Sequence, residues 1–416
     1  MSTLLRLATA GSVDDGKSTL VGRLLHDSRA VLADQLAAAR RASQDRGLGR
    51  VDLALLTDGL RAEREQGITI DVAYRYFATE RRTFLLADCP GHVQYTRNTV
   101  TGCSTADVVV ILVDARTGVV EQTRRHLAVA ALLRVPHVAL AVNKIDLIGF
   151  DESAVAATAG DVRRIASDLG VRDIATVPVC ALDGDNVVER ASRTPWYDGP
   201  TLLDWLENVA LDDEPARRPL RFPVQYVIRP QTAEHRDYRG YAGRIESGRV
   251  GVGDEVAVLP AGRRTRVAGI DTYDGPLASA TAPQSVTLLL SDELDVARGD
   301  LLVAAKDPPE PTREIAGTVC WLGDQPLRPR DRVLVRHGTR TVHGLVHLVE
   351  SRLDLATLRH VPTDSLALND LGRVRVRLAE ALAVDTYADD RATGSFLLID
   401  EHDGATLAAG MVVRDG

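Results

Sequence analysis

The first half of the chain alternates short apolar runs with longer stretches whose apolar residues recur every three or four positions. The short runs predict buried β-strands, and the longer stretches predict amphipathic helices. Strands separated by helices are joined by right-handed crossovers, so we predict a mostly parallel sheet covered on both faces. The predicted strands are Leu4–Ala10, Thr83–Ala87, Asp107–Val113, His137–Val142 and Ala175–Val179, and the predicted helices are Ser18–His26, Tyr95–Gly102, Gln122–Leu133 and Ser153–Leu169.

The pattern changes after a charged, proline-rich segment at Asp212–Pro219, which we interpret as a linker. Beyond it, short β-like runs are punctuated by turns, which predicts a closed or nearly closed barrel. A second break at Lys306–Pro311 precedes another such set, and hence a second barrel. We therefore predict an α/β domain at residues 1–213 and β-barrel domains at 214–308 and 309–416. The predicted barrel strands are Arg221–Ile228, Tyr241–Glu246, Glu255–Leu259, Arg264–Ile270, Ser285–Leu290, Leu301–Ala304, Glu314–Leu322, Arg332–His337, Thr339–Glu350, Gly372–Leu378 and Ser395–Ile399.

Charge and composition mainly argue against certain partners and locations for the protein. The chain has 50 basic and 58 acidic side chains and a net charge of −8, which argues against naked nucleic acid as the main partner. Its longest apolar runs, such as Val108–Val113, are too short to cross a membrane. We expect no secretory signal at the start, and the four cysteines form no Cys-x-x-Cys pair. These features predict a reduced, cytoplasmic protein without structural zinc.

The segment after the first predicted strand carries a phosphate-binding pattern. Gly11-Ser-Val-Asp-Asp-Gly16-Lys17-Ser18 fits G-x-x-x-x-G-K-[ST] and opens a predicted helix. Backbone N–H groups of such a loop enclose phosphate oxygens. Lys17, one of only three lysines, would reach the β- and γ-phosphates, and the Ser18 hydroxyl would bind Mg²⁺. We expect nucleotide contacts from Gly11, Ser12, Val13, Asp14, Asp15, Gly16, Lys17, Ser18 and Thr19.

A second motif selects the base of the nucleotide. Asn143-Lys144-Ile-Asp146 follows the predicted strand at His137–Val142. The Asp146 carboxylate can accept hydrogen bonds from N1–H and the exocyclic amine of guanine, whereas adenine has an acceptor at N1 and would be rejected. Asn143 would steady the base and the neighbouring loop, and the Lys144 stem would cover one face of the ring. The motif after a phosphate loop therefore predicts guanine.

The next predicted strand ends at Cys180, Ala181 and Leu182. At this position the Ala181 N–H could be directed at guanine O6. We therefore include all three residues among those expected to bind the nucleotide.

A third motif lies where the predicted strand Thr83–Ala87 ends. In Asp88-Cys-Pro-Gly91-His92, Asp88 would hold Mg²⁺ through water and the Gly91 N–H would contact the γ-phosphate. His92 is placed to orient the attacking water, so we expect Lys17, Gly91 and His92 to act in hydrolysis. Upstream, Thr69 would supply a second hydroxyl to Mg²⁺ and order its loop only while the γ-phosphate is present.

These motifs, followed by two barrels, resemble the translation-factor class of GTPases. Within that class, Gly11–Leu25 and the block Val51–Phe77 look like the large subunit of bacterial sulfate adenylyltransferase, and Gln94-Tyr-Thr-Arg-Asn98 is a third such fragment. Elongation factors usually carry His where this loop has Asp15. The chain departs from the family at Val93, where Glu is usual, and at Cys180, where Ser is usual.

The resemblance implies a division of labour between two proteins. The large subunit hydrolyses GTP with Mg²⁺, while a separate small adenylylating subunit joins ATP to sulfate to give adenosine 5′-phosphosulfate and diphosphate. The sequence agrees with this division, because it contains neither a Ser-Gly-Gly-x-Asp-Ser nor a His-x-Gly-His element for adenylylation. It also contains no second phosphate loop, so we expect no adenylylsulfate kinase domain.

Two other functions share the nucleotide motifs. A translation elongation factor that delivers aminoacyl-tRNA should have a basic face across its barrels and bind tRNA in a salt-dependent way. A non-catalytic assembly GTPase would bind GTP without turnover coupled to sulfate. The acidity of the chain and the block Val51–Phe77 favour the sulfate adenylyltransferase subunit.

Overall fold

The computed structural model describes residues 3–45, 47, 51–56, 72–171, 173–211, 214–230 and 237–414. The chain forms two compact units; residues up to 211 make up the bulk of the first, and residues from 212 onward make up the bulk of the second. Part of the predicted linker is ordered as a short helix, α8 (Glu214–Arg217). No helix in the described ranges combines the length and the apolar character that a bilayer crossing requires.

The first unit is built on a six-stranded sheet with the order β2-β3-β1-β4-β5-β6. β3, β1, β4, β5 and β6 run parallel to one another, and β2 is an antiparallel edge strand. The mostly parallel sheet predicted from the apolar runs is therefore confirmed. The strands are β1 (Thr3–Gly11), β2 (Ala73–Ala78), β3 (Arg82–Asp88), β4 (Val108–Asp114), β5 (His137–Asn143) and β6 (Ile174–Pro178).

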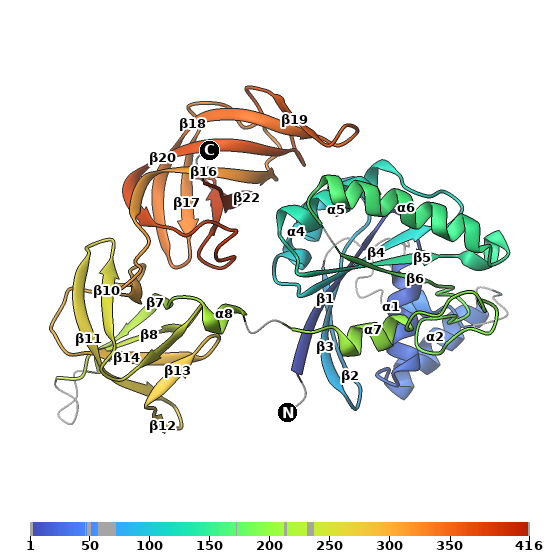
Figure 1. Ribbon diagram of the computed structural model, residues 1–416, viewed down its shortest axis with the longest axis horizontal. Coiled ribbons are helices and arrows are strands. Elements are labelled where there is room, and N and C mark those ends of the chain that lie inside the picture. Colours follow the sequence, from blue (N-terminus) through green and yellow to red (C-terminus); the bar gives the residue numbers. More distant parts are fainter. Residues whose placement is uncertain are drawn as a thin grey trace. The chain divides into compact units, whose positions relative to one another are not determined.

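Helices cover both faces of this sheet, with α4, α5 and α6 on one side and α1 and α7 on the other (Figure 1). The hydrophobic core on the α1 side joins Leu20 and Leu24 of α1 to Leu202 and Leu206 of α7. The helical elements are α1 (Lys17–Asp27), α2 (Ala33–Asp45), η1 (Leu53–Leu56), η2 (Val93–Tyr95), α4 (Thr96–Ser104), α5 (Glu121–Leu132), η3 (Ile145–Ile148), α6 (Glu152–Asp168) and α7 (Leu202–Asn208).

The register of the parallel strands aligns the predicted motifs. Thr9 of β1 pairs with Asp88 of β3, and Asp114 of β4 pairs with Asn143 of β5. In a parallel sheet the carboxyl ends of all strands meet at one edge, where ligands of open α/β sheets bind. The phosphate loop after β1, the Asp88 loop after β3 and the Asn143 loop after β5 therefore share this edge.

The second unit contains two closed, antiparallel barrels of six strands each. The first closes through β10–β11 and the second through β17–β18. This confirms the predicted α/β fold followed by two β-barrels. The barrel strands and their short neighbours are β7 (Arg221–Ile228), β8 (Gly240–Arg244), β9 (Arg249–Gly251), β10 (Glu255–Leu259), β11 (Arg263–Thr272), β12 (Gly275–Pro276), β13 (Ser279–Thr281), β14 (Ser285–Leu290), β15 (Leu301–Ala304), β16 (Pro311–Trp321), β17 (Arg332–His337), β18 (Arg340–Asp354), β19 (Arg359–Pro362), β20 (Leu371–Ala383), β21 (Ser395–Ile399) and β22 (Thr406–Val412).

A buried ion pair joins the two barrels. Arg221 of β7 contacts Asp385 with both ends of its guanidinium, at 2.8 Å and 2.9 Å, and its side chain is only 6% exposed. Burial raises the pKa of Asp385, but Arg221 and the Thr393 hydroxyl outweigh that effect and hold the pKa below its ordinary 3.8. Arg221 therefore neutralises a carboxylate that has little access to water.

We expect Arg221→Ala to destabilise the second unit by about 3–5 kcal/mol, because it leaves the Asp385 carboxylate buried without its partner. The low folded-state pKa of Asp385 contributes stability above pH 3.8, and this contribution is lost as the pH falls through the folded pKa. Urea unfolding at several pH values should show this acid dependence in the parent and lose it in the variant. Arg328→Ala, at an exposed position, is the control; equal stability of both variants would contradict the prediction.

Candidate functional site

The phosphate loop is a tight turn between β1 and α1. Asp14 and Gly16 have positive φ values of 66° and 93°, a conformation that glycine adopts without steric strain. A Cβ at Gly16 would lie 2.5 Å from Nδ2 of Asn143, so only glycine fits there. The Asp15 carboxylate accepts a hydrogen bond from the Ser12 N–H at 2.6 Å, and burial raises the pKa of Asp15. A hydrogen bond between two of its own residues therefore stabilises the loop.

Lys17 lies inside the loop rather than in solvent. Its Nζ donates to the carbonyl oxygens of Gly11 and Ser12, each at 2.8 Å. Burial lowers the pKa of Lys17, and the nearby charge of Asp88 opposes this shift. A Cβ at Gly91 would lie 2.4 Å from the Lys17 Nζ and 2.8 Å from the Gly11 carbonyl oxygen. The structure thus brings together Lys17 and Gly91, which the sequence predicted to act on the same phosphate.

Asp88 and His92 lie on either side of Gly91. Asp88 is 1% exposed, and one of its carboxylate oxygens accepts a hydrogen bond from the Thr9 hydroxyl at 3.0 Å. His92 is half-buried directly before η2, with its ring edge-on to Tyr95 at 6.2 Å between centroids. The Thr99 hydroxyl of α4 donates to the Pro90 carbonyl oxygen at 3.3 Å and holds the loop against the helix.

The described residues of the predicted Mg²⁺ site suit that ion chemically. Ser18 offers a hydroxyl at the start of α1 and Asp88 a carboxylate, and Mg²⁺ prefers such hard oxygen ligands. Thr69, the third predicted ligand, lies outside the described residues. The Ser18 and Asp88 assignments remain predictions.

The base-recognition motif is linked directly to the phosphate loop. Asn143 is 2% exposed, and its Nδ2 donates to the Asp15 carbonyl oxygen at 2.7 Å. Its Oδ1 accepts a hydrogen bond from the Ala181 N–H at 3.0 Å. Lys144 donates to the Asp14 carbonyl oxygen from the same side. One amide side chain therefore connects three loops that are far apart in the sequence.

Asp114 is a residue of this network that the sequence analysis missed. It ends β4, next to Asn143, and its carboxylate pairs with Lys144 at 3.0 Å and with Arg116 at 2.7 Å. Burial acts to raise the pKa of Asp114, but the hydrogen bonds from Arg116 and Lys144 hold it far below its usual range. Asp114 thus fixes the Lys144 stem where it was predicted to cover the base. The only signal in the sequence was an acidic residue directly after a buried strand.

His126 is a second missed residue. It projects from α5, is 2% exposed, and places Nε2 3.1 Å from the Gly11 carbonyl oxygen that Lys17 also contacts. Burial, together with the charge of Lys17, lowers the pKa of His126 to about 3, so its ring is neutral at physiological pH. A neutral ring can donate only from the protonated nitrogen, which must be Nε2 here. His126 therefore supports the phosphate loop from α5, through the Gly11 carbonyl oxygen.

Asp146 lies on η3, where its carboxylate is half-buried. The Cys180 thiol donates to Asp146 Oδ1 at 3.2 Å. Burial raises the pKa of Cys180 to about 12, so it remains a protonated donor at neutral pH. The Ala181 N–H is paired with Asn143, and its predicted contact with guanine O6 remains a prediction. Leu182 is partly exposed, at 38%.

Cys89 follows Asp88 and is completely buried next to Cys103 of α4. A hydrogen bond with Cys103 and, to a lesser extent, burial raise the pKa of Cys89 well above its ordinary value. Cys89 is therefore a protonated, buried side chain, as expected of a small residue that fills space behind the loop.

We expect Gly91→Ala to weaken binding of GTP about tenfold more than binding of GDP. The new methyl group would displace the Lys17 amine and press on the Gly11 backbone, and the γ-phosphate contact predicted for the Gly91 N–H would be lost. Titration of both nucleotides by calorimetry measures the two affinities. Gly160→Ala is a matched control, because a Cβ at that helical position meets no neighbour within 4 Å. Equal losses for GTP and GDP would contradict a role at the γ-phosphate.

Comparison with known proteins identifies the family. Residues 2–212 match the family described as Elongation factor Tu GTP binding domain, and residues 314–413 match the family described as GTP-eEF1A C-terminal domain-like. Over 99% of this chain and 87% of its own length, Sulfate adenylyltransferase subunit 1 of Cellvibrio japonicus is 47% identical. The chain belongs to the sulfate adenylyltransferase subunit 1 family. The predicted resemblance is thereby confirmed.

Further members of the sulfate adenylyltransferase subunit 1 family support this placement. The protein of that name from Laribacter hongkongensis is 49% identical over 98% of this chain and 85% of its own length. Bifunctional enzyme CysN/CysC of Mycobacterium tuberculosis strain CDC 1551 is 53% identical over 100% of this chain and 68% of its own length. The chain thus carries the GTP-binding domain of a family in which the Cellvibrio japonicus and Laribacter hongkongensis members are named sulfate adenylyltransferase subunit 1.

Proposed function

We propose that this chain is the GTP-hydrolysing regulatory subunit of a sulfate adenylyltransferase. In this function it couples hydrolysis of GTP to the formation of adenosine 5′-phosphosulfate from ATP and sulfate by a small adenylylating partner subunit. The observation that carries the proposal is the network through Asn143, which ties the phosphate loop at Asp15 to the loop at Ala181 that follows β6. The names of the relatives supply the sulfate chemistry.

At the phosphate end, this chain's own residues bind and orient GTP. Lys17 would exchange its contacts with the loop carbonyls for phosphate oxygens, and the Gly91 N–H would meet the γ-phosphate. His92 would orient a water molecule in line with the γ-phosphorus. Held by Ser18, Asp88 and Thr69, Mg²⁺ would neutralise charge that develops on the phosphate oxygens. Loss of the γ-phosphate would release the loops at Thr69 and Gly91, and so change the arrangement presented to the partner.

At the base end, Asp146 would accept hydrogen bonds from N1–H and the exocyclic amine of guanine, while Lys144 covers one ring face. Cys180 holds one Asp146 oxygen, so the carboxylate is oriented before the base binds. Preorganisation of this kind raises affinity because less side-chain entropy is lost on binding.

The decisive experiment measures GTP hydrolysis with and without the small adenylylating subunit, ATP and sulfate. We expect slow hydrolysis by the chain alone and acceleration by as much as ~10³–10⁵ with partner and substrates present, the range seen when a partner completes a GTPase site. Formation of adenosine 5′-phosphosulfate should then require GTP. A rate of GTP hydrolysis that does not change when sulfate and the partner are added would overturn the proposal. Salt-dependent binding of aminoacyl-tRNA would overturn it as well.

A further inference from the structure

The loop that follows β6 is a compact turn at residues 180–185, which we call the base loop. The Cys180 N–H donates to the Asp185 carbonyl oxygen at 3.2 Å, and the Gly184 N–H donates to the Cys180 carbonyl oxygen at 2.7 Å. Gly184 has a φ of 96°, which closes the turn. Within this turn, the Ala181 N–H donates to Asn143 Oδ1 at 3.0 Å and is predicted to be shared with guanine O6 when the base binds. The position of this N–H therefore depends on what holds the base loop.

Arg23 holds the base loop from the side of the phosphate-loop helix. Its Nε donates to the Ala181 carbonyl oxygen at 3.2 Å, and its Nη2 donates to the Leu182 carbonyl oxygen. A Cβ at Gly184 would lie 3.5 Å from the Arg23 Cδ, so the arginine stem packs against the turn. The Arg23 side chain is only 18% exposed. Because α1 begins at Lys17, one helix connects the phosphate-binding lysine to the backbone around Ala181.

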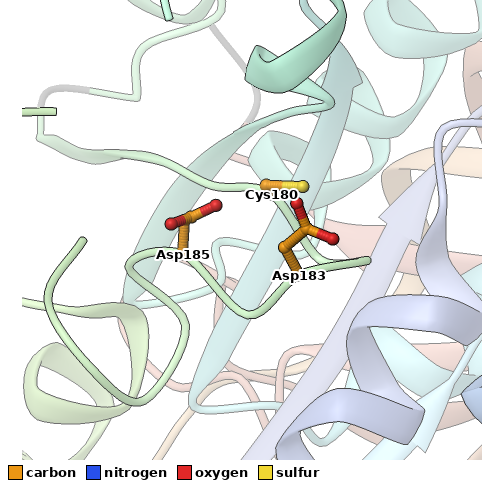
Figure 2. A group of neighbouring side chains, drawn as sticks. All are labelled: Cys180, Asp183 and Asp185. Carbon is orange, nitrogen blue, oxygen red and sulfur yellow. The ribbon is translucent and has the colours of Figure 1, made fainter. Parts of the chain in front are cut away.

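Arg193 holds the acidic side of the same loop. The acidic side of the loop carries a group of three potential metal ligands, Cys180, Asp183 and Asp185 (Figure 2). Arg193 instead donates to Asp183 at 2.9 Å and to Asp185 at 3.2 Å, and its guanidinium lies 4.6 Å from the Phe150 ring centre. Both carboxylates are therefore neutralised by an arginine, and the group carries no metal proposal.

We propose that Arg23 and Arg193 are positioning residues for base recognition, which hold the base loop so that the Ala181 N–H reads O6 of the purine. Arg23 fixes the carbonyl groups of Ala181 and Leu182, which directly follow this N–H, and Arg193 fixes the carboxylates of Asp183 and Asp185 further along the turn. Neither arginine is predicted to touch the base. The inference rests on the proposed binding of guanine nucleotides and specifies which part of the base each element reads.

Two GDP analogues separate the O6 contact from the Asp146 contact. 6-Thio-GDP replaces O6 by sulfur, a poorer acceptor, but keeps N1–H and the exocyclic amine. IDP keeps O6 and N1–H but lacks the amine that Asp146 would bind. In the parent protein, the ratio of GDP to 6-thio-GDP affinity reports the base loop, and the ratio of GDP to IDP affinity reports Asp146.

We expect Arg23→Ala to reduce the GDP to 6-thio-GDP ratio to near unity and to lower GDP affinity about tenfold, the effect of losing one hydrogen bond. The GDP to IDP ratio should remain as in the parent. Arg193→Ala should move the same ratio in the same direction, and Arg23→Lys, which keeps a single cationic donor, should recover part of it. Competition titrations with a fluorescent guanine nucleotide give all these affinities.

Arg164→Ala is the matched control, because Arg164 is exposed on α6 and pairs there with Asp161 at the surface. Thermal unfolding of each variant tests whether the fold is intact, and a purely structural role would lower all three nucleotide affinities by the same factor. That outcome, or an unchanged thio ratio in folded Arg23→Ala and Arg193→Ala, would overturn the inference. Failure of the parent protein to bind GDP would instead overturn the proposed function itself.

Discussion

Asp146→Asn is expected to change the preferred nucleotide of this protein from guanine to xanthine. The Asp146 carboxylate is predicted to accept two hydrogen bonds from guanine, whereas an amide in its place presents one donor and one acceptor, which match the C2 carbonyl and N1–H of xanthine. A site built to hydrogen-bond one ligand rejects the mismatched ligand by about 10⁴–10⁵. Cys180 already contacts one Asp146 oxygen at 3.2 Å, so the substituted amide should keep a defined orientation.

Calorimetric titration of the variant with GDP and XDP measures this reversal directly. Asp168→Asn makes the same chemical change at an exposed position of α6 and should leave GDP affinity unaltered. Guanine preference that survives in Asp146→Asn would remove Asp146 from base recognition. It would also leave the Asn143 network as a structural feature only.

The elements that could be predicted from the sequence are those whose pattern reflects burial. β4 is buried along its whole length, and its run of valine, isoleucine and leucine marks it at once. β2 was missed because Tyr74 and Tyr76 are 50% and 71% exposed, and Phe77, stacked on Phe84 at 4.5 Å, is the only buried residue of this strand. An edge strand held mainly by backbone pairing leaves little trace in the order of side chains.

The helix α2 and the strand β22 were also not predicted, because the side chains of each give only a weak signal. α2 buries only Ala39 and Ser43 among its residues, so its apolar face is too slight to mark a helix. β22 (Thr406–Val412) is rich in alanine and glycine, residues that favour strands poorly, and its place in the barrel comes from pairing with β16 and β21.

Among the residues of the candidate site, those in local sequence motifs could be predicted and those that act through distant backbone contacts could not. Lys17, Asn143 and Asp146 could be predicted because their motifs constrain consecutive residues beside a strand end. Arg23 could not, because its partners Ala181 and Leu182 lie 158 and 159 positions away and are contacted through carbonyl groups that every residue type possesses. His126 was hidden for the same reason, since its hydrogen bond is to the backbone oxygen of Gly11. Long-range contacts to backbone leave no pattern in a single sequence.

His92→Ala should lower the rate constant for GTP hydrolysis by about 10²–10⁴ and leave GTP affinity nearly unchanged. Gly91, its neighbour, lies against Lys17, so the half-buried imidazole is held next to the predicted γ-phosphate position. The ring leans edge-on toward Tyr95, which limits its orientation, and an oriented side chain places water better than a mobile one. Removal of the ring should therefore affect the chemical step and spare binding by the phosphate loop.

Single-turnover hydrolysis with the small subunit and sulfate present separates this step from nucleotide release. His92→Gln should recover part of the rate, because a glutamine amide can also orient the attacking water. His402→Ala, at an exposed position of the second unit, is the control and should behave as the parent. A folded His92→Ala protein with the parent rate would assign water positioning to another residue, whereas loss of GTP affinity would place His92 in binding.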